Sequence, residues 1–292
     1  MTLFSRISFE FPHSQTRQGS FRQSSVLPFL TMSALLLTVA VWSNESTVAA
    51  PLATGAPEVT GLSKDTVSPE LRKAYARFRS REITECLELL KEACENDPDL
   101  PPAHLILAQL YFNANQISLG RGALEEGALQ NPDYPDCYLT LADLAWQEGR
   151  VAEAGLCYNH ALELAKKYDG DEGRKRRFIV RALTGQAKVM EARKQWDEVL
   201  ATLEELLELD SENAQLMQQR GIAMFKTGTA KEAYEALKEA AAKSDEITPA
   251  AVTLGRLYEQ NENREKANQW MEFAAKEGRT DARTRHEVAR WL

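Results

Sequence analysis

Histidine and cysteine are scarce in this sequence, with four of each among 292 residues. Cys86 and Cys94 are eight residues apart on one predicted helix, about 12 Å along its axis, which is beyond disulfide reach. The histidines have no second His or Cys at ligand spacing, and they are His13, His104, His160 and His286. We therefore expect four free thiols that pack as small apolar side chains, and no metal site.

Glycine and proline are also few, with 15 and 11 residues, while 43% of the residues are hydrophobic and 27% are charged. This composition excludes a fibrous or wholly disordered chain and supplies apolar surface for a sizeable core. The net charge of −8 argues against a broad nucleic-acid-binding face, which needs an excess of Lys and Arg. Phosphate-binding Gly-rich loops and the usual nucleophile motifs are missing. The sequence therefore predicts no enzyme, no cofactor and no nucleic-acid partner.

The first fifty residues contain no Lys and no Asp and differ from the rest of the sequence. An Arg-containing segment precedes the apolar run of residues 26–42, and small residues follow it at Val48, Ala49 and Ala50. This order is typical of a secretory signal peptide, but the length of the run also suits a membrane anchor, and a buried core helix is the least favoured alternative. Residues 1–50 are thus predicted to be a signal peptide or an N-terminal membrane anchor, and residues 51–66 a flexible linker.

Two prolines 34 residues apart, Pro98 and Pro132, set the spacing of the remaining sequence, because each follows a helical pattern that proline would end. Small residues recur at the same place in four of the 34-residue units, as Gly120 and Ala154 in one neighbouring pair of units and as Ala233 and Ala267 in another. Small side chains allow the backbones of two paired helices to approach closely, and stacking of such pairs builds a core that no single pair has. The sequence therefore predicts an array of helix-turn-helix repeats.

The pattern resembles the tetratricopeptide repeat family, whose repeat has Leu-Gly or Leu-Ala at positions 7 and 8 and Ala at positions 20 and 27. Leu141-Ala142, Ala154 and Ala161 occupy these positions here. The resemblance implies an all-α fold, a right-handed superhelical solenoid of helix-turn-helix repeats. The expected segments are six repeats at 67–100, 101–134, 135–168, 180–213, 214–247 and 248–281, an insert at 169–179, and a C-terminal capping helix at 282–292.

The insert carries Arg174, Lys175, Arg176 and Arg177. In a long loop such a run is either simply solvated or a site for an anionic partner. The sequence leaves both alternatives open.

In the family, the first helix of each repeat lines the concave face of the solenoid, so the resemblance implies a groove there that binds a peptide or protein segment. Rings offer large contact area and amides pair with a peptide backbone, although packing between repeats also explains the rings. The candidate groove residues are Tyr75, Phe78, Gln109, Phe112, Asn113, Asp143, Trp146, Gln147, Phe225 and Arg256.

The sequence therefore favours a protein-interaction scaffold in cell-envelope assembly that is exported to the periplasm or the exterior, or held at a membrane by its N-terminal segment. The alternative is a self-associating structural subunit, because Trp291 and Leu292 would expose apolar area if the cap fails to cover it. An enzyme is the least favoured hypothesis, because ionisable groups do not cluster on the predicted groove.

Overall fold

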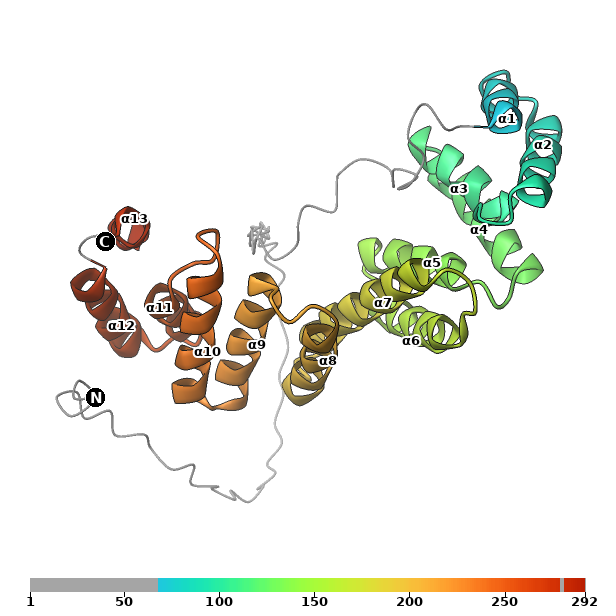
Figure 1. The fold of residues 1–292 in the computed structure, drawn as a ribbon. Coiled ribbons are helices and arrows are strands. Elements are labelled where there is room, and N and C mark those ends of the chain that lie inside the picture. The colour runs from blue at the N-terminus through green and yellow to red at the C-terminus, as the bar shows by residue number, and fades with distance from the viewer. Residues whose placement is uncertain (1–67, 279–280, 292) are drawn as a thin grey trace, which may run out of the picture. The chain divides into compact units, whose positions relative to one another are not determined.

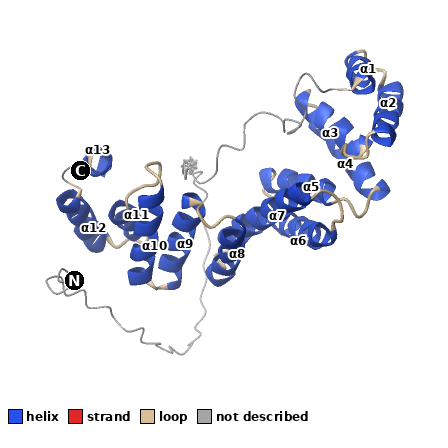
Figure 2. Ribbon diagram, in the orientation of Figure 1, coloured by secondary structure: helices blue, strands red, loops and turns tan. Residues whose placement is uncertain are grey.

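The computed structural model describes residues 68–278 and 281–291, and every regular element within them is an α-helix (Figures 1 and 2). In chain order the described helices are α1 (Pro69–Arg79), α2 (Ile83–Asn96), α3 (Ala103–Asn113), α4 (Ile117–Gln130), α5 (Pro135–Gln147), α6 (Val151–Lys167), α7 (Glu172–Ala192), α8 (Trp196–Leu209), α9 (Ala214–Thr227), α10 (Ala230–Lys243), α11 (Ala250–Gln260), α12 (Arg264–Glu277) and α13 (Ala282–Trp291).

The helices pack in chain order. Each of the pairs α1–α2, α3–α4, α5–α6, α7–α8, α9–α10 and α11–α12 is in contact, and the second helix of each pair also contacts the helix that follows it. Contact with near neighbours in the chain is the pattern of a solenoid, in which each repeat supplies part of the core of the next. The predicted all-α solenoid of helix-turn-helix repeats is confirmed.

The turn inside each pair has the same backbone geometry. One residue in each turn has a positive φ between 57° and 101°, and these residues are Arg81, Asn115, Gly149, Lys194, Gly228 and Glu262. The next residue donates its N–H to the carbonyl five residues earlier, as Gln116 does to Tyr111 at 2.8 Å and Gln195 to Met190 at 2.9 Å. This left-handed C-terminal cap satisfies carbonyls that the helix end would leave unpaired. The cap recurs every 34 residues except across the insert, where the interval is 45.

The extra residues between the third and fourth pairs form helix rather than the loop that the sequence suggested. Helix α6 runs to Lys167, and α7 begins at Glu172, so that most of the insert lengthens α7 to 21 residues. Asp171 caps α7 by accepting a hydrogen bond from the Arg174 N–H at 2.7 Å. A capping carboxylate stabilises a helix start by satisfying a free N–H and by favourable interaction with the helix dipole.

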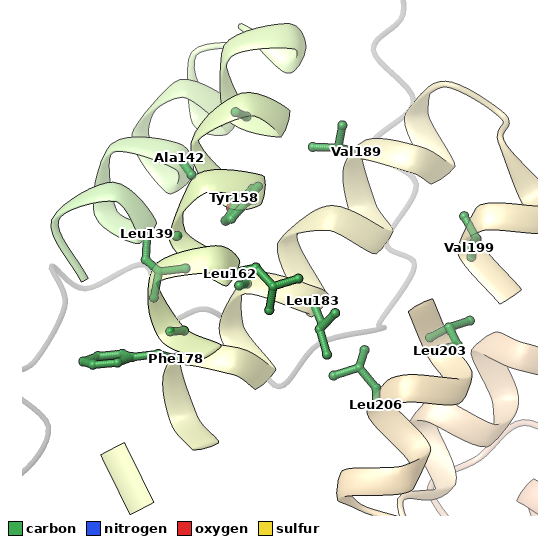
Figure 3. Close-up of a cluster of buried hydrophobic side chains, with 14 of the residues drawn as sticks. Leu139, Ala142, Tyr158, Leu162, Phe178, Leu183, Val189, Val199, Leu203 and Leu206 are labelled. Atoms are coloured by element: carbon green, nitrogen blue, oxygen red, sulfur yellow. The ribbon is translucent and has the colours of Figure 1, made fainter. Parts of the chain in front are cut away.

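Buried side chains from successive helices meet in several clusters. The largest contains Leu139, Tyr158, Leu162, Phe178, Leu183, Val199, Leu203 and Leu206, drawn together in Figure 3. Gly185 makes one contact in this cluster possible, because a Cβ there would lie 2.2 Å from the Tyr158 ring. Small residues thus sit where a neighbouring large side chain needs the space, as the repeat pattern implies.

The chain ends with α13, which lies against α11 and α12. Val288 is buried and Trp291 packs half-buried on a cluster that includes Val252 and Met271. At the other end, the predicted leader (1–50) and linker (51–66) lie outside the described residues. None of the described helices has both the length and the hydropathy required to cross a membrane.

Candidate binding face of the first helices

The first helices of the pairs, α1, α3, α5, α7, α9 and α11, carry all ten residues predicted to bind a partner. The structure divides these residues by exposure. Asn113 and Gln147 are exposed; Tyr75, Phe78, Phe112, Asp143, Trp146 and Arg256 are intermediate; and Gln109 and Phe225 are buried. We call this set the first-helix face.

Three aromatic side chains on this face are already part of the packing between helices. Phe78 meets Tyr111 edge-to-face with ring centroids 5.2 Å apart, and Trp146 packs against the largest buried cluster. Phe112 lies against α4, because a Cβ on Gly120 would be 2.4 Å from its Cε1 atom. These rings expose one edge and use the other for stability, which makes them poor positions for an alanine test of binding alone.

Phe225 does not contribute to an exposed surface, and the prediction that it does is wrong. Only 7% of it is exposed, and its ring packs edge-to-face on Tyr258 with centroids 4.8 Å apart. The ring fills the space between α9 and α11, so burial of apolar area rather than ligand binding accounts for it. Repeat position alone therefore does not separate packing rings from exposed ones.

Gln109 is the one buried amide among the predicted residues. Its side chain lies on α3 with 9% of the residue exposed, and its Oε1 atom accepts no hydrogen bond from the described residues. A buried acceptor without a partner costs about 1–3 kcal/mol. Because the oxygen itself is buried, a bound segment does not reach it in this structure.

Asp143 belongs to an ion-pair network between α5 and α7 that the sequence reasoning did not find. The Arg181 guanidinium donates to both Asp136 and Asp143, with Nε 3.0 Å from Oδ2 of Asp143. The Tyr158 hydroxyl also donates to Asp143, and Thr140 lies 3.4 Å from Arg181 Nη2. Asp143 is thus held by neighbours within the chain rather than free for a partner.

Burial and the neighbouring carboxylates have opposite effects on the pKa of Arg181. Burial disfavours the charge of Arg181, but Asp136 and Asp143 outweigh it and raise the pKa of the guanidinium. Burial and the neighbouring Asp143 carboxylate raise the pKa of Tyr158, so this hydroxyl remains a donor. Asp136 and Arg181 stand at the second position of successive predicted repeats, and opposite charges at that position were the signal available in the sequence.

Arg256 is also engaged within the chain, because its guanidinium pairs with Glu287 of α13. A further charged group lies at the C-terminal ends of the first helices, where Lys226 Nζ donates to Asn261 Oδ1 at 3.2 Å. Burial raises the pKa of the nearby Glu191 carboxyl and lowers the pKa of Lys226. Of the ten predicted residues, Asn113 and Gln147 therefore remain exposed without an ion pair or a ring contact that fixes them.

The basic run of the insert is used partly inside the fold. The Arg174 guanidinium donates to the carbonyl oxygen of Asp99 at 2.6 Å, and Arg176 donates to the carbonyl of Leu209. Asp99 lies in the α2–α3 connection and Leu209 ends α8. Both hydrogen bonds lie at the surface, and Arg176 and Arg177 are exposed, so a solvated run and a site for an anionic partner both remain open.

Reactive thiols and metal ligands are the other chemistry that the described residues could supply. Cys86, Cys94, Cys137 and Cys157 are free thiols, and burial raises the pKa of Cys137 to about 12, which disfavours the reactive thiolate. The described part of the chain contains no group of three or more His, Cys, Asp or Glu residues arranged to hold a metal ion.

Residues 135–168, which span α5 and α6, match the family model described as Tetratricopeptide repeat. No curated protein matches the chain.

Several solved structures are similar in fold. The crystal structure of YrrB, titled as a TPR protein with an unusual peptide-binding site, has 17% identity and a TM-score of 0.49 over 70% of this chain and 100% of its own. Yeast Tom70 has 18% identity and a TM-score of 0.48 over 66% of this chain and 40% of its own. For PilF of Pseudomonas aeruginosa the identity is 13% and the TM-score 0.46, over 76% and 96%. Because these TM-scores are below 0.5, the fold assignment relies on the helices of the chain itself.

The matched repeat has the left-handed turn at Gly149, and five further helix pairs repeat that turn with the same hydrogen bond. Their second helices contact the first helices of the next pair, as the family's stacking requires. Residues 135–168 therefore form a tetratricopeptide repeat, and the other described helix pairs share its turn and its stacking. This fold is typical of modules for protein–protein interaction.

Proposed function

We propose that this protein binds a segment of a partner polypeptide along the first-helix face. The observation that carries the proposal is the pair of exposed amides, Asn113 on α3 and Gln147 on α5, which no ion pair or ring contact among the described residues holds in place. Their side chains can pair with the main-chain N–H and C=O groups of an extended segment.

The neighbouring residues on the same face support this assignment. Asn113 follows one turn after Gln109 on α3, and Gln147 ends α5, and both side chains are exposed. Tyr75 on α1, Phe112 on α3 and Trp146 on α5 present partly exposed rings on the same set of first helices. Rings supply contact area with few rotatable bonds, and amides supply hydrogen bonds to an extended chain.

We further propose that the partner is met during assembly of the cell envelope. The support is the composition of residues 1–50, which has the order of a secretory signal peptide or a membrane anchor. N-terminal sequencing of the protein recovered from its source tests this proposal. A mature N-terminus near Ala50 supports export with cleavage, an intact N-terminus in a membrane fraction supports the anchor, and recovery of the intact chain in the cytosol contradicts both.

The alternative of a self-associating subunit has lost part of its basis. Trp291 packs half-buried on the α11–α12 cluster, and Leu292 lies outside the described residues. We therefore keep partner binding as the function that the described residues support best.

The test of partner binding is affinity capture with the full chain as bait, because the partner is unidentified. The N113A/Q147A variant removes the two exposed amides. We expect partner recovery to fall at least about fivefold for this variant, the loss of one good hydrogen bond. Glu205→Ala on α8 is the control. Equal recovery with all of these baits contradicts the assignment of the face.

A further inference from the structure

In the part of the chain that the structure describes, exposed large apolar side chains lie on α4 and α6. Among the described residues, the large hydrophobic side chains that remain exposed are Ile117, Leu119, Leu129 and Leu156, at 41%, 55%, 76% and 71%. Three of them lie on α4, and the fourth lies on α6. Isolated exposed leucines are common, but several on one helix mark an interaction surface.

Leu119, Gly122, Glu126 and Leu129 follow one another on α4 at intervals of three, four and three residues, so they form one stripe along the helix. All four are exposed. This stripe faces away from the buried residues of α4, which are Gly120, Leu124, Gly127 and Ala128.

Gly122 has no structural reason within the chain. A Cβ at each of the other glycines inside the described helices would meet a neighbouring side chain, whereas a Cβ on Gly122 would meet nothing within 4 Å. An exposed glycine within a helix lowers stability relative to alanine. The open side of Gly122 leaves room for the close approach of another backbone, which a glycine permits.

The charged side chains of α4 that no ion pair engages are both acidic. Glu125 and Glu126 are exposed on α4, and the single basic residue of the helix, Arg121, is paired with Glu148. The whole chain is acidic at −8. Charge therefore disfavours a second copy of this chain or an anionic lipid surface as the occupant, and favours a basic one.

We propose that the α4 stripe docks a basic amphipathic helix of a partner protein, separately from the first-helix face. A partner helix crosses α4 at Gly122, its apolar residues cover Leu119 and Leu129, and its Lys or Arg side chains pair with Glu125 and Glu126. The helical spacing of the stripe and the glycine at its middle suit helix-on-helix packing, in which side chains of one helix fill the grooves of the other.

The probes are two synthetic 20-residue amphipathic helices of the same Leu and Ala stripe, one flanked by Lys and the other by Glu. Binding to the full chain is followed by fluorescence anisotropy. We expect the Lys peptide to bind at least about tenfold more tightly than the Glu peptide, and L119S/L129S and Glu126→Lys each to weaken it about tenfold. Glu205→Lys is the matched control, since Glu205 is the exposed α8 residue that corresponds to Glu126.

Gly122→Ala separates docking from folding. It should raise the melting temperature of the full chain, because alanine favours the helix, and weaken the Lys peptide about fivefold, because the added methyl group holds the partner away. Equal binding of the two peptides, equal losses for Glu126→Lys and Glu205→Lys, or unchanged affinity of Gly122→Ala would overturn the proposal. Dimers that L119S/L129S dissociates, seen in sedimentation equilibrium, would also overturn it and assign the stripe to a second copy.

Discussion

The second helices α4 and α8 occupy the same place in their repeats but present different surfaces. Each begins two residues after a left-handed turn residue, Asn115 or Lys194, and each has 14 residues. Counted from those turns, the buried Leu124 corresponds to the buried Leu203. On the exposed side, Leu119, Gly122 and Leu129 correspond to Glu198, Ala201 and Glu208.

This difference shows which part of a repeat the fold constrains. The buried side must fit its neighbours in every repeat, whereas the exposed side has no partner within the chain and is free to differ. The exposed carboxylates of α8 keep that repeat solvated. The exposed leucines of α4 and its open glycine do not improve the solubility of the chain. Exposed positions at which equivalent helices carry different types of residue are therefore better indicators of function than exposed positions at which they carry the same type.

The largest expected effect is a loss of stability at the buried position that α4 and α8 share, which is Leu124 in α4 and Leu203 in α8. Leu124→Ala and Leu203→Ala each remove a side chain that is at most 1% exposed, and each should lower the free energy of unfolding by about 2–5 kcal/mol. Chemical denaturation of the full chain measures both values. A cost below about 1 kcal/mol in one helix alone would mean that the two repeats are not packed alike.

The next effect concerns Gly120, which corresponds to Val199 on α8. Gly120→Val should destabilise the chain by about 1–3 kcal/mol, because the added Cβ would lie 2.4 Å from the Phe112 ring. The same denaturation experiment measures it, and Gly122→Val, two residues away on the open side, is the matched control. An equal loss for both would show that helix propensity, and not contact with Phe112, sets the cost.

A smaller effect of opposite sign is expected at the exposed position. Gly122→Ala should raise the free energy of unfolding by about 0.5–1 kcal/mol, and Ala201→Gly should lower it by a similar amount. Thermal unfolding followed by circular dichroism detects both changes. Destabilisation by Gly122→Ala would show that the glycine has a structural role in this chain and would remove it from the docking stripe.

The smallest expected effect is on the pH dependence of stability. It concerns the first helices of the same two repeats, α3 and α7, in which Phe112 corresponds to Glu191. Burial raises the pKa of Glu191, so the folded state favours its protonated form. The resulting loss of stability is absent at pH values below the unfolded pKa of about 4.3 and develops as the pH rises through the folded pKa. Glu191→Gln should therefore raise the melting temperature at pH 7 but not at pH 3.5. A constant difference across this range would point to packing instead.

Most of the fold was predictable because it depends on local spacing. Pro98, Pro132 and the recurring small residues set the period, and the backbone turns repeat with it. The turns were harder to predict from the sequence, because only Gly149 and Gly228 among the six turn residues are glycine. The other four adopt a positive φ under the constraint of the packed helices on either side.

The candidate site was predictable only as a face. Repeat positions identified the helices correctly but not the state of each side chain, since Phe225 is buried and Asp143 is held by Arg181. Whether a side chain is buried or paired depends on which side chain of the next repeat lies against it. The sequence of one repeat alone does not specify that neighbour. The helical form of residues 172–179 was missed for a related reason, because Asp171 caps a helix there whose basic residues bond to Asp99 and Leu209.

Hydrogen exchange of the full chain, alone and with the partner recovered by affinity capture, tests the central claim most directly. If the partner binds along the first-helix face, amides in the C-terminal turns of α3 and α5, next to Asn113 and Gln147, should exchange more slowly in the complex, while α8 is unchanged. Slower exchange in α4 as well would accompany occupation of the docking stripe. Protection confined to α8, or none in α3 and α5, would contradict the claim that the first helices bind the partner.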